Sequence, residues 1–477
     1  MGKLKHASEN SEPPTAAATS SAFGMHPSRD ELYAMGKALR EKCPRASHAA
    51  YQRAADRPDP IVLLEESNKG RIPELIPVRF GRMLVSPFTW YRGSALNMAA
   101  DLAVTPTSGL RVQCCGDAHL CNFGAYATPE RRVIFDVNDL DETLPAPWEW
   151  DVKRLAASFV LACRDNGFSE DFARDTVLTC VRSYREHMVE YSKMRTLDVW
   201  YDSIDLEKMI EAAEDEDARR RGQKRLAKAR QRSVLEHDYP GLVHTTGLTP
   251  TIKENPPTIY HMRDHGQEEI MRRVKQAFAA YRETLPESRR VLLDRFKLMD
   301  VAIKVVGVGS VGTMCAIILM MANDNDPLFL QVKEARQSVL EPYAGKSPHD
   351  NHGQRVVHGC QLMQSASDLF LGWTRGEQGR DFYVRQLKDM KISAMVEAFS
   401  RSVMLHYAQS CAWALSRAHA RSGEPAKISG YLGKGDTFDK AIADFSIAYA
   451  DQTEQDHEVL MKAVRAGKLQ VFIEPEQ

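Results

Sequence analysis

The stretch that decides the fold is "CCGDAHLCNFGAYATPERRVIFDVNDLDETLPAPWEWD", residues 114–151. Apolar runs predict one strand just before it, at 110–114, and another at 131–137, while the apolar period after 150 predicts a helix. Strands mixed with helices in this way predict an α+β fold. The same stretch concentrates polar side chains next to its apolar strands, and these are Asp117, His119, Asn122, Asp136, Asp139 and Asp141.

Composition limits what the chain does. Its 477 residues are 43% hydrophobic and 27% charged, which is typical of a globular protein of two or three domains, or of two lobes around a cleft. A net charge of −1 argues against a nucleic-acid or anionic-membrane partner. Nine cysteines without metal-type spacing indicate reduced thiols in a cytoplasmic protein. The polar N-terminus carries no secretory pattern.

The chain divides into six segments by composition and pattern. We expect a disordered tail at 1–25, a helical part with the acidic stretch at 26–204, a charged helical insertion at 205–240, a helical connection at 241–294, a β-rich part at 295–390 and a second helical part at 391–477.

Two segments need a decision between alternatives. Residues 205–236 change from acidic to basic, and we interpret them as a solvated helix, because nucleic-acid binding would favour interleaved aromatic residues. Residues 305–322 carry no charge, but their glycine-rich first half favours a buried β-hairpin over a membrane span.

The acidic stretch suits a magnesium site. A carboxylate at Asp117 is able to accept a hydroxyl proton or to orient an attacking oxygen. Asn122 offers a neutral oxygen and Asp139 a charged one, and Mg²⁺ prefers one or two carboxylates with water or phosphate in its remaining positions. The alternative is a capped turn with surface carboxylates.

A second candidate site lies nearly two hundred residues later. "GVGSVG" supplies Gly307, Gly309, Ser310 and Gly312 between two apolar strands, and backbone N–H groups without Cβ atoms approach a phosphate closely. A dinucleotide-binding loop would open a helix, whereas a strand follows here. Lys333 is predicted on the third strand, 21 residues after Gly312. A tight hairpin with a surface lysine is the alternative.

These motifs together resemble the protein-kinase-like superfamily, especially aminoglycoside and choline kinases, which carry HGDxHxxN before a strand that ends in a metal-binding Asp. Here Cys115 replaces the first His. The resemblance implies Asp117 as catalytic base, Asn122 as Mg²⁺ ligand and His119 as a residue that braces the loop. Asp136, Asp139 and Asp141 compete as the second metal ligand, and we prefer Asp139 because Asp151 follows it at the superfamily's twelve-residue spacing.

The order of the two motifs departs from ordinary kinases, where the glycine-loop lobe precedes the catalytic loop. The resemblance therefore implies a two-lobed, kinase-like fold with circularly permuted connectivity, and the predicted helix at 407–423 resembles the one that precedes the catalytic loop. Kinases also use a helix Glu to hold the lysine. Here Glu341 lies just after the strand, and the predicted helix at 354–371 offers only Gln361 and His358.

Most of residues 75–460 resemble a bacterial family, domain-of-unknown-function family 2252. The matching text is "SPFTWYRGSA", "GDAHLCNFGAY", "FDVNDLDETLPAPWEWDVKRLAAS", "VGVGSVGT", "LQVKEA" and "FYVRQLKDMK". Arg92 and Arg385 recur in that pattern. Each is able to clamp an anionic substrate, although structural pairing is an equal alternative.

We therefore expect a phosphotransferase that uses ATP and Mg²⁺ and acts on a hydroxyl-bearing acceptor. Gly307–Gly312 and Lys333 would bind the nucleotide, and Asp117 would orient the acceptor. The alternatives are a catalytically silent nucleotide-binding or scaffold protein and a metal-dependent phosphohydrolase. The sequence identifies neither the acceptor nor the oligomeric state.

Overall fold

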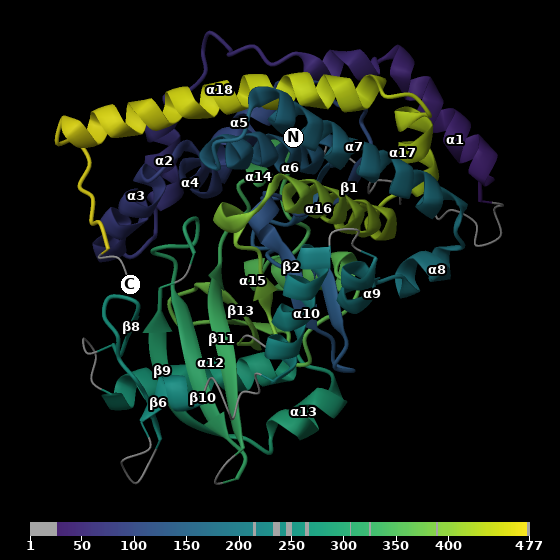
Figure 1. Cartoon of the computed structure of the whole chain (residues 1–477). Helices are drawn as coiled ribbons and strands as arrows, with labels where there is room; N and C mark the ends of the chain where they lie inside the picture. The colour runs from purple at the N-terminus through teal and green to yellow at the C-terminus, as the bar shows by residue number, and fades with distance from the viewer. Residues whose placement is uncertain are drawn as a thin grey trace, which may run out of the picture.

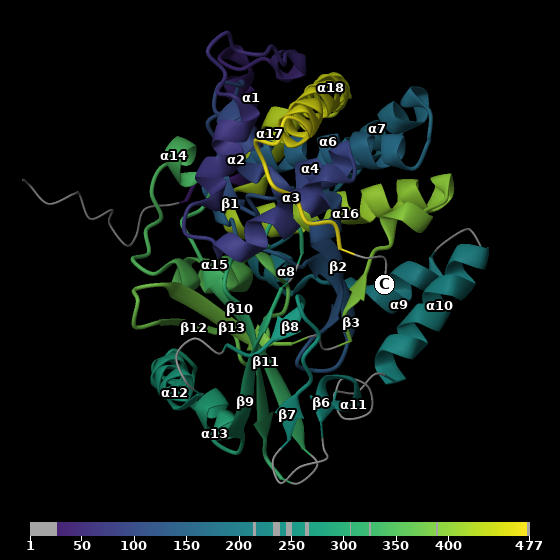
Figure 2. The same ribbon diagram turned by 90° about the vertical axis from the view of Figure 1, so that its left-hand side faces the viewer.

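The computed structural model describes residues 26–212, 216–231, 239–244, 250–262, 267–305, 307–323, 326–387 and 390–474. The predicted tail at 1–25 lies outside these residues. The fold is α+β, as predicted. Helices gather in the upper part of Figure 1, and an antiparallel sheet lies below them; Figure 2 shows the same division from the side.

The helices alternate with strands in the first half of the chain and dominate its end. Their bounds are α1 Arg29–Ala38, α2 Pro60–Asn68, α3 Ile76–Leu84, α4 Pro87–Gly93, α5 Ala95–Leu102, α6 Trp148–Asp165, α7 Glu170–Lys193, α8 Thr196–Tyr201, α9 Leu206–Glu211, α10 Glu216–Gln231, α11 Tyr239–Leu242, α12 Gln267–Glu283, α13 Glu287–Leu293, α14 Glu341–Ala344, α15 His352–Met363, α16 Arg401–Ser422, α17 Pro425–Leu432 and α18 Thr437–Arg465.

The strands form two larger sheets and two pairs. Their bounds are β1 Arg111–Cys114, β2 Phe123–Ala127, β3 Val133–Val137, β4 Leu144–Pro147, β5 Ile204–Asp205, β6 Val243–His244, β7 Thr251–Ile252, β8 Ile259–Tyr260, β9 Lys297–Lys304, β10 Cys315–Met321, β11 Pro327–Ala335, β12 Gly372–Arg375, β13 Asp381–Gln386 and β14 Ile392–Ser393.

Helix α6 is the centre of the helical part. Every residue from Trp148 to Cys163 is buried, because α7, α16 and α18 pack around this helix. Helix α18 crosses the top of the molecule in Figure 1 and packs against α6 and α7. A helix buried on all sides fixes its own side chains firmly, so α6 is a rigid base for the loops that lie against it.

The larger sheet has the order β12-β13-β11-β10-β9-β8, and its neighbouring strands pair antiparallel. Successive side chains in a strand point to opposite faces. Leu330 and Val384 therefore pack with α12 and α13 on one face, and Lys333 points to the other face, where it pairs across the strands with Tyr383. The second sheet, of order β14-β2-β3-β5, carries the acidic stretch, and β1 pairs with β4 beside it.

Helix ends differ from the prediction where a tertiary hydrogen bond stops a helix. The helix predicted at 354–371 ends at Met363, because the Gln364 side chain donates to the backbone oxygen of Val137 and the amide of Ser365 donates to Asp136. The predicted helical part at 391–477 opens with a short strand, 392–393, that pairs with β2, and α16 starts only at Arg401.

The charged insertion is helical and largely exposed, as expected, but part of its longer helix is buried. In its described residues it forms α9 and α10, and Leu226 of α10 is buried against Ala125 and Val133 of the second sheet. The predicted helical connection contains α12 and α13, preceded by the short strands β6, β7 and β8. The uncharged run at 305–322 leads into β10 as predicted, and no helix in the described parts of the chain has the length and hydrophobicity of a membrane span.

Candidate functional site

The loop after β1 carries the first predicted site, and a glycine shapes it. Gly116 has a φ of +84°, and a Cβ at this position would lie 2.3 Å from the backbone oxygen of Glu142. Only glycine suits both conditions. At the start of α6, Asp151 accepts hydrogen bonds from the amides of Cys115, at 2.6 Å, and Gly116, at 3.0 Å. The buried helix therefore holds the loop backbone directly.

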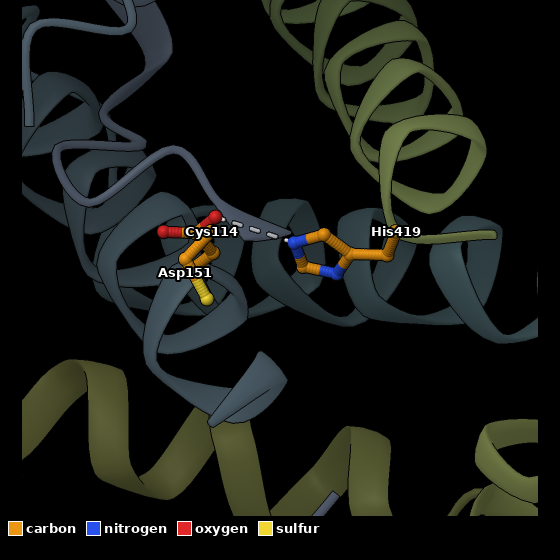
Figure 3. Close-up of side chains that lie close together, drawn as sticks. All are labelled: Cys114, Asp151 and His419. Carbon is orange, nitrogen blue, oxygen red and sulfur yellow. Dashed lines mark hydrogen bonds and ion pairs between the residues drawn. The ribbon is translucent and has the colours of Figure 1, made fainter. Parts of the chain in front are cut away.

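Asp151 belongs to a buried cluster with Cys114 and His419 (Figure 3). Among the described residues, this is the only group of three or more potential metal ligands whose ligand atoms lie close enough together to share an ion. The oxygens of Asp151 already accept the two loop amides and His419 Nε2, at 3.2 Å. Burial raises the pKa of the Cys114 thiol, so the thiolate that a metal would need is disfavoured. We interpret the cluster as a brace that ties α16 to the loop.

Asp117 lies on the braced loop and is ion-paired. Arg154 of α6 donates to Asp117 Oδ1 through Nε, at 2.6 Å, and Nη2 lies 2.5 Å from the same oxygen. The Asp117 side chain remains 19% exposed, and Oδ1 is the oxygen that Arg154 holds. His119 Nε2 lies 3.8 Å from Oδ2, and burial lowers the pKa of His119 to about 4. His119 is therefore neutral at pH 7 and packs against the loop.

Asn122 connects this loop to the end of β3. Its side-chain Nδ2 donates to the backbone oxygen of Asp117 at 2.7 Å, and its own backbone oxygen accepts the amide of Asn138 at 2.8 Å. The side-chain Oδ1 thereby points away from the loop backbone and accepts no bond from a described residue. An amide oxygen without a donor is a ligand type that a hard cation accepts.

The three competing aspartates have different surroundings. Asp136 is fully buried, and its oxygens are occupied by Arg417 Nη2, at 2.6 Å, and by the amide and hydroxyl of Ser365. Asp141 accepts from Lys333 Nζ at 2.7 Å and from the hydroxyl of Tyr383 at 2.6 Å. Asp139 is 33% exposed and lies 3.6 Å from Lys333 Nζ. Of the three, Asp139 has the most exposed carboxylate and the longest contact with a cation. It is also the aspartate that the sequence spacing favoured as a metal ligand.

Lys333 is the residue that joins the two predicted sites. It is 4% exposed, and burial alone would lower its pKa, but the carboxylates of Asp139 and Asp141 outweigh burial and hold the pKa of Lys333 well above its usual value. Burial and the charge of Asp139 raise the pKa of Asp141, while Lys333 and Arg385 lower the pKa of Asp139 despite its burial. Lys333 is therefore a fixed cation, and Asp139 is a fixed anion.

A cavity of about 600 Å³ opens beside this ion pair. Its lining combines the polar or charged residues Asp139, Lys333, Arg385, Asp326 and Asp368 and the loop residues Gly307 and Ser310 with the apolar residues Leu292, Phe296, Leu328, Phe370 and Leu371. This size is ordinary for a small-molecule site. Leu387 and Lys391, between β13 and β14, contribute to the wall as well. The cavity therefore suits a ligand with an apolar body and an anionic end.

The glycine loop is anchored to the helical part. Val311 is fully buried against Leu75 and Val78, Arg71 Nη1 donates to the backbone oxygen of Val311 at 2.6 Å, and Arg82 donates to that of Gly307. A Cβ at Gly309 would lie 3.1 Å from the backbone oxygen of Arg92, and one at Gly312 would lie 3.1 Å from Cβ of Arg71. Gly309 and Gly312 therefore serve close packing, and Gly307 and Ser310 face the cavity.

The two arginines proposed as clamps lie in different places. Arg385 lines the cavity and donates only to neutral oxygens, those of Gln331 at 3.1 Å and Asn138 at 3.3 Å, within the described part of the chain. Arg92 lies in the last turn of α4 and does not line the cavity, and its buried Nε has no hydrogen-bond partner among the described residues. Arg385 is therefore positioned for an anion in the cavity, whereas Arg92 lies near His119 and its charge helps to lower the pKa of that residue.

Comparison with known proteins gives one match. A family model described as uncharacterised proteins conserved in bacteria, domain-of-unknown-function family 2252, matches residues 71–463. The chain belongs to this family. All the candidate site residues lie within the match. No curated protein and no solved structure matches the chain.

Three further residues of this family member take part in the site without having been predicted. Arg154 pairs with Asp117, and Tyr383 binds Asp141. Arg355 of α15 is buried and donates to the backbone oxygens of Thr143, at 2.6 Å, and Asp141, at 2.8 Å. Arg154 follows Asp151 by three residues, so the sequence alone places both on one face of the predicted helix. No comparable spacing points to Tyr383 or Arg355.

Proposed function

We propose that the protein is an ATP- and Mg²⁺-dependent phosphotransferase with a two-lobed, kinase-like and circularly permuted arrangement. One observation carries the proposal. Lys333 Nζ lies 2.7 Å from Asp141 and 3.6 Å from Asp139, although the chain separates these residues by nearly two hundred positions. The lysine of the glycine-loop sheet and the carboxylates of the acidic stretch thus share one site, as a phosphotransferase requires.

The cavity fits a nucleoside triphosphate. Its lining offers a planar base the contacts of Phe370 and Leu371, and Lys333 and Arg385 supply cations. The amides of Gly307 and Ser310 donate to no acceptor among the described residues, so they are available to phosphate oxygens. Apolar and cationic lining residues of this kind would suit the base and the phosphates of ATP.

The oxygen ligands fit Mg²⁺. Asp139, which lines the cavity, and Asn122, which lies on the braced loop, would hold the ion, because both supply oxygen ligands of the kind that Mg²⁺ prefers. When bound, Mg²⁺ would neutralise phosphate charge. Asp117 would accept a hydrogen bond from the acceptor hydroxyl and so orient its oxygen, while Arg154 holds the carboxylate in place. His119 would stay neutral at pH 7.

The order of elements supports the permuted arrangement. Strand, glycine loop, strand, lysine strand and helix follow one another from β9 to α15, as the resemblance to kinases implies. Helix α16 then follows the sheet and contacts the catalytic-type loop through His419 and Asp151. A cleft depends on where its walls lie and not on which wall comes first along the chain, so the reversed order is no obstacle.

Nucleotide binding and turnover test the proposal separately. We expect ATP with Mg²⁺ to raise the melting temperature of the wild type, and Lys333→Ala to abolish this shift. Lys297→Ala is the matched control, because Lys297 is an exposed lysine of the same sheet. Asp117→Asn should still bind ATP but lose γ-phosphate release or transfer. Absence of an ATP shift in the wild type, or an equal shift in Lys333→Ala, would overturn the proposal.

A silent nucleotide-binding protein is the second candidate. The ion pair between Asp117 and Arg154 favours it, because Arg154 already occupies an oxygen of the carboxylate that would orient the acceptor. ATP binding without any turnover, identical in the wild type and Asp117→Asn, would select this candidate. We do not propose a phosphohydrolase, since Asp136 and Asp141 are already ion-paired and a two-metal centre needs uncommitted carboxylates.

A further inference from the structure

A second cavity, of about 590 Å³, lies on the opposite face of the six-stranded sheet, between the sheet and α12. Figure 2 shows α12 beside the sheet on the side away from the helical part. Side chains alternate between the faces of a strand, so Val332 and Val384 line this cavity while their neighbours Lys333 and Arg385 line the first one. The two cavities are therefore separate sites that share β11 and β13.

The body of this cavity is apolar. Ala316 and Ile318 supply its floor from β10, and Val274 and Phe278 face them from α12. Protein interiors are close-packed, and a helix that covers a sheet normally leaves few voids larger than a water molecule. The volume lies within the usual range of small-molecule sites, and an apolar cavity of this kind holds apolar ligands in preference to water.

The rim is charged, but its cations are compensated. Arg273 Nε lies 2.8 Å from Glu269 and Arg380 Nη1 lies 3.1 Å from Glu334. His261 bridges Glu254 and Asp300, at 3.0 Å from each. An anionic head group would have to displace a carboxylate of the chain at each of these cations. A charged ligand therefore gains little at the rim, and an uncharged one leaves the ion pairs intact.

We propose that this cavity binds an uncharged, elongated apolar molecule of the long-chain alcohol or ester class. The apolar chain lies between α12 and the sheet, and the polar end reaches the rim, where it exchanges hydrogen bonds with water and with the paired side chains. The site is independent of nucleotide binding, because it occupies the other face of the sheet.

The test uses the uncharged fluorophore N-phenyl-1-naphthylamine with the full chain. We expect saturable binding and displacement by 1-dodecanol. Ala316→Phe places a ring on the cavity floor and should remove the binding. Ala277→Trp, from the α12 side, is the second variant in case the first fails to fold. Ala280→Phe adds the same ring to an exposed position of α12 and should bind like the wild type, as should Lys333→Ala.

Four results would overturn the proposal. They are the absence of saturable binding, binding that both cavity-filling variants retain, binding lost equally in Ala280→Phe, and displacement by dodecanoate but not by 1-dodecanol. The last would replace the uncharged ligand with an anionic one. None of these results bears on the ATP-induced shift and its loss in Lys333→Ala, so the phosphotransferase proposal stands or fails by itself.

Discussion

Asp136 and Asp139 lie three residues apart, and the same substitution in each should affect a different property of the protein. Asp136→Asn removes the carboxylate that faces Arg417, a residue whose side chain is 0% exposed. Asp139→Asn changes a carboxylate that is 33% exposed and lines the cavity. The first should weaken folding, and the second should weaken nucleotide binding in the presence of Mg²⁺.

The magnitudes follow from the surroundings of each pair. Removal of one partner from a buried ion pair costs about 3–5 kcal/mol. We expect Asp136→Asn to lie in that range, because Arg417 Nε and Nη1 have no hydrogen-bond partner among the described residues to compensate for the loss. Asp139→Asn should cost about 1 kcal/mol or less, since the pair is partly solvated and Lys333 keeps Asp141 at 2.7 Å.

Urea unfolding followed by tryptophan fluorescence and by circular dichroism measures both variants. Coincident transitions would justify a two-state free energy. The double variant Asp136→Asn/Arg417→Met serves as a check, because it removes both buried charges and should be more stable than Asp136→Asn alone. Equal destabilisation by the Asp136 and Asp139 variants, or a double variant that is no more stable than the single one, would refute the assignment of Asp136 to the fold.

Two further predictions concern the catalytic-type loop. Burial lowers the pKa of His119 to about 4, below its value near 6.5 in an unfolded chain. The unfolded state therefore binds a proton more readily, and the free energy of unfolding should fall as the pH drops from about 6.5 to 4. In acid titrations monitored by circular dichroism, His119→Gln should lose less stability over this window than the wild type, and an equal loss would contradict the lowered pKa. Gly116→Ala puts a Cβ 2.3 Å from the backbone oxygen of Glu142 at a φ of +84°, so it should lower the melting temperature and abolish ATP turnover. The control is Gly109→Ala, which is also at positive φ but has open space around it. It should lower the free energy of unfolding only by the backbone strain of about 1 kcal/mol.

Periodicity predicted the elements that depend on burial alone. The apolar runs at 297–304, 315–321 and 327–335 became neighbouring strands because their side chains alternate between two covered faces. Helix ends were harder, because they depend on partners far along the chain. The residues after α15 show this: Gln364 and Ser365 leave the helix to bind β3, and no local pattern announces a hydrogen bond to Val137 or Asp136.

The same reasoning applies to the site. Residue type and spacing identified Lys333 and the group of aspartates, since only lysine and carboxylates supply those charges. The choice among the aspartates depends on which one meets Arg417 and which one meets Tyr383, and both partners come from elements more than two hundred residues away. Spacing to Asp151 favoured Asp139, and the exposed fraction of Asp139 agrees with it.

The lysine has an acidic partner even though no helix glutamate reaches it. Asp141 takes that place, and it lies on the loop that also carries Asp139. Helix α15 acts on this loop instead of on the lysine, because Arg355 grips the backbone oxygens of Asp141 and Thr143. A shift of α15 would therefore move the lysine's partner and the candidate metal ligand together. If phosphoryl transfer occurs here, the nucleotide and metal contacts are coupled through one loop, and Arg355→Met should weaken the ATP shift and its dependence on Mg²⁺ to the same degree.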